Sequence, residues 1–255
     1  MQGGFDATAA IAEFQAARRR GVHFPPAWFD RLSLDQAYRV QLGQVAAEGK
    51  RQLGWKVGLT AKPIQQQFGF HEPVFGCLLE DGLIHSGHVF PAGSLIAPGF
   101  ETELCLRLGT PLSGAVDAAT ARRAIAAVHP ALEIIETRGD FTAQIAVAIA
   151  DNAQQKAFVI GPATPFDPMD TRLDRVEARV AANGVEVARG TGDAVLGDPV
   201  NALVWLAGKL AEYGRSLRQG DYVMSGSFVR QFPLAPGDRV EAAFSGVGTV
   251  AVGMA

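Results

Sequence analysis

The chain has 255 residues, of which 48% are hydrophobic and 19% are charged, and its formal net charge at pH 7 is -3. This size and composition suit one large domain, or a main domain with a small helical appendage, that buries a substantial core. The nearly balanced charge gives no reason to expect nucleic acid or a membrane surface as a partner, and no apolar run approaches the roughly 20 residues that span a bilayer.

The cysteine content and the amino-terminal sequence favour a cytoplasmic protein. Cys77 and Cys105 are the two cysteines of a chain too long to need disulfide bonds for its stability. The amino-terminal sequence lacks the basic start and apolar centre of a secretory signal. The run Arg18–Arg20 is also found in mitochondrial transit peptides, but the acidic Asp6 and Glu13 argue against one. We therefore expect a protein of the cytoplasm.

The first 52 residues have the pattern of a helical segment. Apolar residues recur at helical spacing between about residues 6 and 20. Pro25–Pro26 then interrupts, because two prolines cannot continue a helix. A second helix starts after Ser33, which together with Gln36 fits a capping box. We expect a helical amino-terminal segment over 1–52.

From residue 53 to residue 255 the pattern changes to short apolar runs separated by glycine and proline, which predict strands. Residues alternate in polarity on both sides of Asn183-Gly184, a pair typical of a type I′ hairpin turn. Two helices interrupt the strands, one over 117–128 and one from Asp198 to Gly214. Because strands outnumber helices without a regular alternation, a mixed α+β body is predicted.

Two glutamates stand two residues apart in the apolar run "FETELCL". In a strand, Glu101 and Glu103 would point to the same face and repel each other. A solvated sheet face or pairing with arginine or lysine would each explain them. A third carboxylate, Glu133, lies in another apolar run, where an unpaired charge is costly.

A divalent cation is the most economical common partner for three carboxylates on adjacent strands. Oxygen ligands alone favour a hard ion, Mg²⁺ or Mn²⁺, over zinc. Three carboxylates and one dication carry a charge of about -1 and leave room for a chelating ligand and water. The pair His85 and His88 lies in a glycine-containing turn and is better explained as surface than as ligands.

A proton donor beside the cation would be Lys56, in the apolar run "WKVGL". The alternative is a lysine whose stem is buried while its amine reaches water. The turn Ser225–Phe228 could hold an anion through its hydroxyls and N–H groups, or be an ordinary turn. The glycine-rich run Gly190–Gly197 fits no nucleotide-binding motif.

Several of these motifs occur in one order along the chain: "KVGLT", "PVFGCLLEDG", "PGFETELCLRLG", "PALEIIETR", "ADNA", "AVLGDPVNALVWLAGKL" and "SGSF…PGDRV…GVGTV". With them, the sequence resembles the hydratase/decarboxylase branch of the fumarylacetoacetate hydrolase superfamily, typified by 2-keto-4-pentenoate hydratases. The similarity runs from about Asp35 to the carboxyl terminus. It implies a mixed β-sandwich or roll with flanking helices and a helical amino-terminal part, so that residues 53–255 form the catalytic domain.

The resemblance also assigns roles to residues. It implies that Glu101, Glu103 and Glu133 bind the metal and that Lys56 and Asp81 are catalytic. The residues that we expect to contact the substrate are Ser225, Ser227, Asp151 and Arg138.

The activity that the resemblance implies is hydration of a 2-hydroxy-2,4-dienoate to a 4-hydroxy-2-oxo acid, in the meta-cleavage degradation of aromatic compounds. A decarboxylase of a 2-oxo-3-enedioate would use the same metal site, with Arg138 or Arg230 as contacts for the second carboxylate. An acylpyruvate hydrolase and a non-catalytic partner of a pathway enzyme are further alternatives. Relatives also imply a homo-oligomer and association with a pathway enzyme. Gln154 and Gln155 depart from the family pattern, and "SGS" at Ser225 favours the hydratase.

Overall fold

The structure is a computed structural model, and it describes residues 5–67 and 69–255. The helices are α1 (Ala7–Arg19), α2 (Leu34–Glu48), α3 (Lys62–Gln67), α4 (Ala118–Ala124), α5 (Ile145–Ala150) and α6 (Val200–Ala211). The strands are β1 (Gln52–Gly58), β2 (Val74–Leu79), β3 (Leu83–His85), β4 (His88–Phe90), β5 (Pro98–Leu108), β6 (Ile125–Glu136), β7 (Gln155–Ile160), β8 (Thr164–Pro165), β9 (Glu177–Ala182), β10 (Val185–Thr191), β11 (Tyr222–Ser227), β12 (Phe232–Pro233), β13 (Arg239–Phe244) and β14 (Gly248–Met254).

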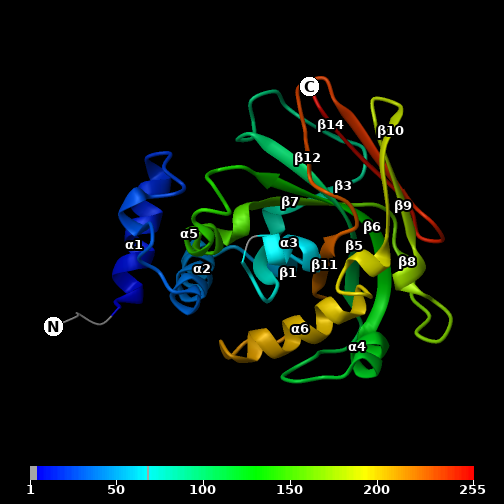
Figure 1. Cartoon of the computed structure of the whole chain (residues 1–255), viewed down its shortest axis with the longest axis horizontal. Coiled ribbons are helices and arrows are strands. Elements are labelled where there is room, and N and C mark those ends of the chain that lie inside the picture. The colour runs from blue at the N-terminus through cyan, green and yellow to red at the C-terminus, as the bar shows by residue number, and fades with distance from the viewer. Residues whose placement is uncertain (1–4, 68) are drawn as a thin grey trace.

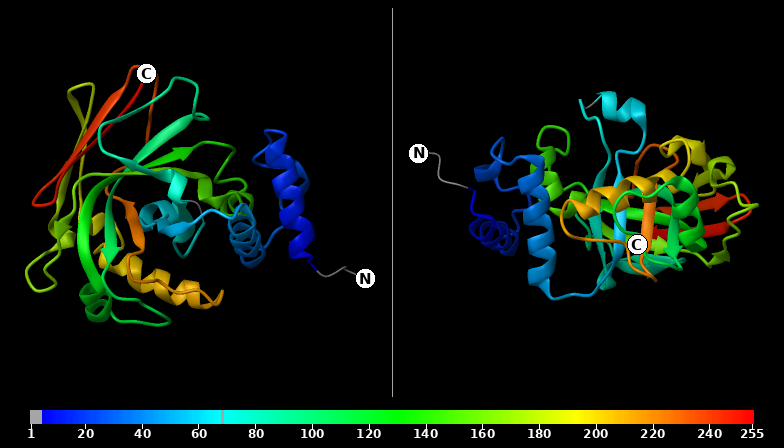
Figure 2. Two further views of the ribbon diagram at one scale, coloured as in Figure 1. Left: turned by 180° about the vertical axis from the view of Figure 1, so that it is seen from behind. Right: turned by 90° about the horizontal axis from the view of Figure 1, so that it is seen from below.

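Two sheets curve round a shared apolar core (Figures 1 and 2). The nine-stranded sheet has the order β2-β1-β11-β5-β6-β7-β3, with β12 paired to β5 and β8 to β6. The five-stranded sheet has the order β10-β9-β13-β14-β4. Figure 1 shows α1, α2 and α5 grouped on the amino-terminal side and α6 running along the roll near α4. The predicted mixed α+β roll with flanking helices is confirmed.

The amino-terminal helices form where their caps predict them. The hydroxyl of Ser33 accepts from the N–H of Gln36, whose side chain accepts from the N–H of Ser33, and this completes the capping box. The carboxylate of Asp6 accepts from the first N–H groups of α1. Apolar residues of α1 and α2 join the same buried core as the strands. The division into a segment over 1–52 and a domain over 53–255 stays a prediction.

The Asn183-Gly184 hairpin joins β9 and β10 as predicted, with φ of 53° and 80° at the two turn residues. The helix expected over 117–128 is shorter. It ends at Ala124, and Ile125 already begins β6, because the following residues pair with β5. Competition from strand pairing therefore shortens this helix.

Among residues 5–67 and 69–255, no helix has the length and the apolar character needed to cross a bilayer.

The long antiparallel pair β5–β6 lies in the middle of the larger sheet. Its register places Glu101 directly opposite Glu133, while Glu103 stands two residues further along β5. Residues two apart on a strand, and residues directly opposite on paired strands, share one face of the sheet. The backbone register alone thus brings three carboxylates to one face.

Candidate metal centre and active site

Glu101, Glu103 and Glu133 form a compact cluster. Each offers one carboxylate oxygen, and these oxygens all lie within 4.8 Å of one another. Glu103 and Glu133 are fully buried, whereas Glu101 is half-buried. The cluster therefore lies at the base of the roll's interior rather than on a solvated sheet face.

The buried oxygens of the cluster are not satisfied by the described part of the protein. One oxygen of Glu103 accepts from the N–H of Gly226 at 2.8 Å, but Oε1 of Glu103 and both oxygens of Glu133 have no hydrogen-bond partner there. A buried carboxylate without partners is expensive. Unsatisfied hard oxygens on three converging carboxylates fit a divalent cation such as Mg²⁺ or Mn²⁺.

Lys56 of β1 is the cation that the fold itself places at the cluster. Its side chain is 5% exposed, and Nζ lies 3.3 Å from Oε1 of Glu133, within ion-pair distance but outside hydrogen-bonding geometry. The alternative of an amine that reaches water is therefore excluded. If all four groups are ionised, one ammonium and three carboxylates leave a net charge of -2, so Lys56 does not neutralise the site.

Burial and mutual repulsion shift the pKa of every group in the cluster. Desolvation raises the pKa of Glu133 to about 7, although the neighbouring Lys56 opposes this. Desolvation, and then the charges of Glu133 and Glu101, raise the pKa of Glu103 well above its ordinary value. Desolvation also raises the pKa of Glu101. Burial lowers the pKa of Lys56, but the three carboxylates outweigh it and the net shift is upward. Without a cation, the cluster therefore retains protons.

Gly226 shapes the strand next to the cluster. The register of β11 against β5 shifts between Met224 and Ser227, and Gly226 in this irregularity has a φ of 108°. A Cβ atom at Gly226 would lie 2.3 Å from the hydroxyl of Thr60. Glycine is therefore required for β11 to approach closely enough to bond Glu103. The sequence suggests that the hydroxyls and N–H groups of "SGSF" could hold an anion; in the structure the N–H of Gly226 bonds the carboxylate of Glu103, and the glycine itself is needed for this approach.

A cavity of about 360 Å³ opens beside the cluster. One wall is ionic, with Lys56 and Glu101. The remaining lining combines apolar and polar side chains, mainly Leu59, Thr60, Val74, Ile135, Phe141, Thr142, Gln154, Ser227, Val229, Arg230 and Gln231. A cavity of this size, with a mixed apolar and polar lining, is suited to a small organic molecule.

The two predicted serines have different positions. Ser227 lines the cavity, and its hydroxyl accepts from the N–H of Thr102 at 3.0 Å. Ser225 is fully buried behind Gly226 and does not belong to the cavity lining. Ser227 is therefore placed to contact a molecule in the cavity, whereas the substrate contact of Ser225 stays a prediction.

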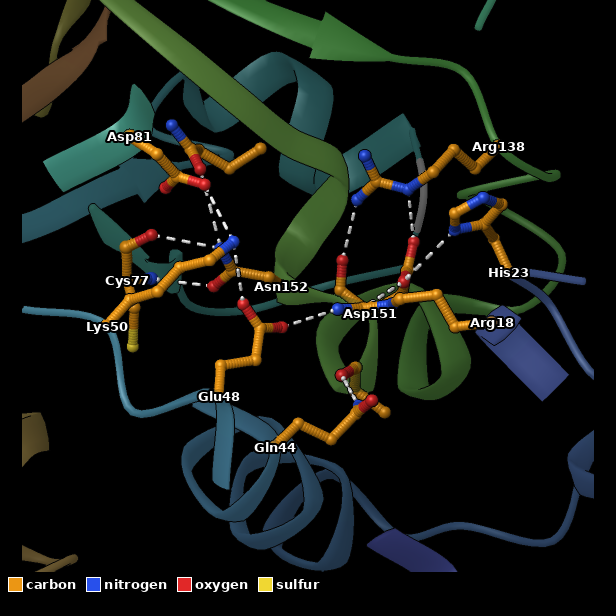
Figure 3. Close-up of polar contacts among 12 residues, drawn as sticks. Arg18, His23, Gln44, Glu48, Lys50, Cys77, Asp81, Arg138, Asp151 and Asn152 are labelled. Atoms are coloured by element: carbon orange, nitrogen blue, oxygen red, sulfur yellow. Dashed lines mark hydrogen bonds and ion pairs between the residues drawn. The ribbon is translucent and has the colours of Figure 1, made fainter. Parts of the chain in front are cut away.

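Asp81, Arg138 and Asp151 were predicted to be near the substrate, but the structure places them elsewhere. Asp81 is exposed, in a short turn after β2, and pairs with Lys50 at 2.6 Å. Arg138 pairs with Asp151 at 2.5 Å and with Glu136 at 3.0 Å. These side chains belong to a separate polar region between the amino-terminal helices and α5 (Figure 3).

In this structure the three residues have other partners, and their predicted roles stay predictions. Asp81 lies exposed in the turn after the outer strand β2, pairs with Lys50, and is not among the residues that line the cavity with Lys56. Arg138 and Asp151 are already satisfied by each other, and Arg18 also reaches Asp151 at 2.9 Å. Breaking buried pairs of this kind to bind a substrate would be costly.

Comparison with known proteins agrees with this geometry. The profile of the family described as fumarylacetoacetate (FAA) hydrolase C-terminal matches residues 44–254. The chain belongs to the fumarylacetoacetate hydrolase family.

Relatives within this family have related activities. The chain is 34% identical over 229 residues to 2-keto-4-pentenoate hydratase of Paraburkholderia xenovorans, which covers 87% of this chain and 84% of that protein. It is 32% identical over 233 residues to 2-oxo-hept-4-ene-1,7-dioate hydratase of Escherichia coli, which covers 87% of each. The structure of 4-oxalocrotonate decarboxylase from Pseudomonas putida G7, complexed with magnesium and adipate, is similar with a TM-score of 0.89 and 27% identity, over 98% of this chain and 97% of that one.

Proposed function

We propose that the protein is a Mg²⁺- or Mn²⁺-dependent hydro-lyase that converts a 2-hydroxy-2,4-dienoate into a 4-hydroxy-2-oxo acid in the degradation of aromatic compounds. The observation that carries this proposal is the buried cluster of three carboxylates, with unsatisfied oxygens, beside Lys56 and a cavity of about 360 Å³. The similarity to a 2-keto-4-pentenoate hydratase supports the reaction.

Glu101, Glu103 and Glu133 would hold the metal ion. When bound, the ion supplies electrophilic stabilisation of negative charge on the carboxylate and the 2-oxygen of the substrate. The cluster needs this positive charge, because Lys56 leaves it at -2 when all groups are ionised.

Lys56 is the proposed proton carrier. The reaction first moves the proton of the 2-hydroxyl to C5 of the dienoate, which gives a 2-oxo-3-enoate. Water then adds, with its oxygen at C4 and a proton at C3. The ammonium of Lys56 lies at the cavity wall beside the carboxylates. It gives its proton to C5, and the amine left behind takes the proton of the 2-hydroxyl, so the lysine ends this step in the form in which it began.

The remainder of the cavity positions the substrate and the water. Leu59, Val74 and Ile135 supply an apolar wall against which a diene can lie. Thr60 and Thr142 supply hydroxyls that can orient a water molecule. This division between an ionic end and an apolar body matches a small unsaturated acid.

A second carboxylate on the substrate is the specific alternative, and Arg230 favours it. Arg230 lines the same cavity, packs over the ring of Phe232 at 4.0 Å, and makes no ion pair within the described residues. It can therefore receive the distal carboxylate of an enedioate, whereas Arg138 is already paired. A hydratase or a decarboxylase of such a diacid would use the same carboxylate cluster.

The test compares two substrates with metal-loaded protein. We expect loss of the ultraviolet absorbance of a monocarboxylate 2-hydroxydienoate without CO₂ release. Release of CO₂ from a 2-oxo-3-enedioate, with no hydration of either substrate, would replace the hydratase by the decarboxylase.

Arg230→Gln should lower kcat/KM for a diacid by about tenfold or more and leave kcat/KM for the monoacid nearly unchanged, if Arg230 binds the second carboxylate. Gel filtration with light scattering tests the proposed homo-oligomer.

A further inference from the structure

Three consecutive residues next to the cavity have a left-handed backbone. Asn152, Ala153 and Gln154, between α5 and β7, have φ of 58°, 48° and 61°. Residues with a Cβ atom adopt this region at a cost of about 1 kcal/mol or more each. A turn of this kind persists only when its surroundings hold it in place.

Helix α2 holds the chain immediately before this turn. The amide of Gln41 donates to the carbonyl of Ile149 at 2.8 Å. The amide of Gln44 donates to that of Ala150 at 2.7 Å (Figure 3). Both glutamines are buried. They satisfy carbonyls at the end of α5 that a helix leaves without partners, so they fix where the helix stops.

Arg138 holds the next residue. Its guanidinium donates to the carbonyl of Asp151 at 2.8 Å as well as to the Asp151 carboxylate. The pair that was predicted to contact substrate therefore fixes the start of the turn. Figure 3 shows the side chain of Arg138 pointing toward Asp151, which stands next to Asn152 on this segment.

The side chain of Asn152 joins the turn to strand β2. Its Oδ1 accepts from the N–H of Cys77 at 2.7 Å, and its Nδ2 donates to the carbonyl of Cys77 at 2.9 Å (Figure 3). Because β2 is the outermost strand on this side of the sheet, the amide occupies the place that a further strand would take. We call this pair of hydrogen bonds the Asn152 clamp.

The turn that the clamp holds lies next to Gly76, the residue opposite Lys56 in the sheet. A Cβ atom at Gly76, the register partner of Lys56, would lie 3.1 Å from the carbonyl oxygen of Asn152 and 3.2 Å from Cγ and Cε of Lys56. Gly76 thus leaves the turn and the lysine stem in close proximity, with no side chain between them. Ala153 and Gln154 of the turn line the cavity that contains the lysine.

We propose that Asn152 is a positioning residue, which holds the left-handed turn and thereby fixes the side chain of Lys56 and the adjacent cavity wall. The inference rests on the proposed function as far as Lys56 acts in the reaction. Asn152 is neither a member of the carboxylate cluster nor one of the residues that line the cavity, so its effect passes through the turn and through Gly76.

The test is the substitution Asn152→Gly, because glycine tolerates the positive φ but removes both hydrogen bonds of the clamp. Asn183→Gly is the matched control. Asn183 also has a positive φ, of 53°. Its amide accepts a hydrogen bond from the N–H of Arg239 and donates one to the carboxylate of Asp238, but it lies in the exposed β9–β10 turn.

The expected result for Asn152→Gly is a fall in kcat of about 100-fold, with Mn²⁺ affinity unchanged within about twofold, because the metal-binding glutamates lie on β5 and β6. We also expect acylation of Lys56 by a small reagent, followed by mass spectrometry, to become about fivefold faster or more, because the loosened turn exposes an amine that is now buried. Asn183→Gly should change none of these quantities.

Other results overturn the inference. A wild-type kcat and unchanged Lys56 acylation in Asn152→Gly would show that the clamp positions nothing. A parallel loss of kcat and Mn²⁺ affinity would show a general structural defect instead. If wild-type protein itself hydrates no dienol, the proposed function fails, and the Lys56 acylation rate alone decides whether Asn152 holds the lysine. If Asn152→Gly does not fold, Asn152→Asp, which keeps the bond to the Cys77 N–H, takes its place with an intermediate change expected.

Discussion

At the scale of single residues, the site confines three carboxylates and one ammonium within the roll. The consequence is a dependence on pH that the metal-free protein must show. The folded state raises the pKa of Glu103 and of Glu133, the latter to about 7 from an ordinary value of 4.5. The folded state then binds more protons than the unfolded state, so its free energy of unfolding falls as pH rises between about 4.5 and 7.

Thermal unfolding in a chelating buffer measures this dependence. Wild-type protein should lose stability, on the order of 2–3 kcal/mol, between pH 5 and pH 8. Glu103→Gln should lose clearly less stability over this pH range. The glutamine amide cannot ionise, and the loss of the Glu103 carboxylate relieves its repulsion with Glu133. Parallel curves for the two proteins would contradict the pKa assignment.

Lys56 is the residue on which the proposed proton transfer depends. Lys56→Met keeps a long apolar stem but removes the ammonium, and it should lower kcat by about 10²–10⁴-fold while metal affinity is retained or increased. Lys50→Met is the matched control, since Lys50 pairs with the exposed Asp81 outside the cavity. We expect it to keep kcat within about twofold. Equal activity of the two variants would remove Lys56 from the mechanism.

At the scale of elements, β5 and β6 carry the three proposed metal-binding glutamates, and the N–H of Gly226 in β11 bonds one of them, Glu103. Gly226→Ala should destabilise the fold by about 1–3 kcal/mol and weaken Mn²⁺ binding, because the new Cβ meets Thr60 and displaces the N–H that bonds Glu103. Gly184→Ala is the control for backbone strain alone, since its φ is 80° but no atom lies within 4 Å of its Cβ position. A Gly226→Ala protein that binds Mn²⁺ as tightly as wild type does would show that β11 has no such role.

The same scale explains what the sequence could predict. Strand alternation is a local property, so the shared face of Glu101 and Glu103 was readable from their spacing. Glu133 was found because a charge inside an apolar run requires a partner. Its place directly opposite Glu101 depends on the β5–β6 register, which no local pattern contains.

Other positions depend on how distant elements pack. Asp81 lies in the turn after β2, an outer strand, and does not line the cavity with Lys56, and this strand order is not visible in a motif. Arg138 forms an ion pair with Asp151, and Arg18 of α1 forms another with the same carboxylate. Three charged residues that the sequence leaves free to bind a substrate are therefore paired with one another. The left-handed turn at Asn152 contains no glycine, the residue from which such a turn is usually predicted.

At the scale of the whole molecule, the cation and the fold are linked. Binding to the folded state alone stabilises it, by about 2.7 kcal/mol when the free ion is at 100 times its dissociation constant. Mn²⁺ and Mg²⁺ should therefore raise the midpoint of thermal unfolding of wild-type protein in a concentration-dependent way. The midpoint of Glu103→Gln should respond much less, and an equal response would mean that the ions bind elsewhere.

The roll and the amino-terminal helices also act together. Gln41 and Gln44 of α2 bond the segment that carries the turn at Asn152, so the helical segment supports the cavity without lining it. The larger sheet brings the ligands together, and the helices fix the wall that faces them.

Direct titration of Mn²⁺, followed by the loss of the free-ion electron paramagnetic resonance signal, tests the central claim that the three buried glutamates form one metal site. Wild-type protein should bind one Mn²⁺ per chain, and Glu101→Gln, Glu103→Gln and Glu133→Gln should each weaken that binding by about tenfold or more. Wild-type protein that leaves Mn²⁺ free, or three variants that bind it as tightly as wild type, would contradict the account.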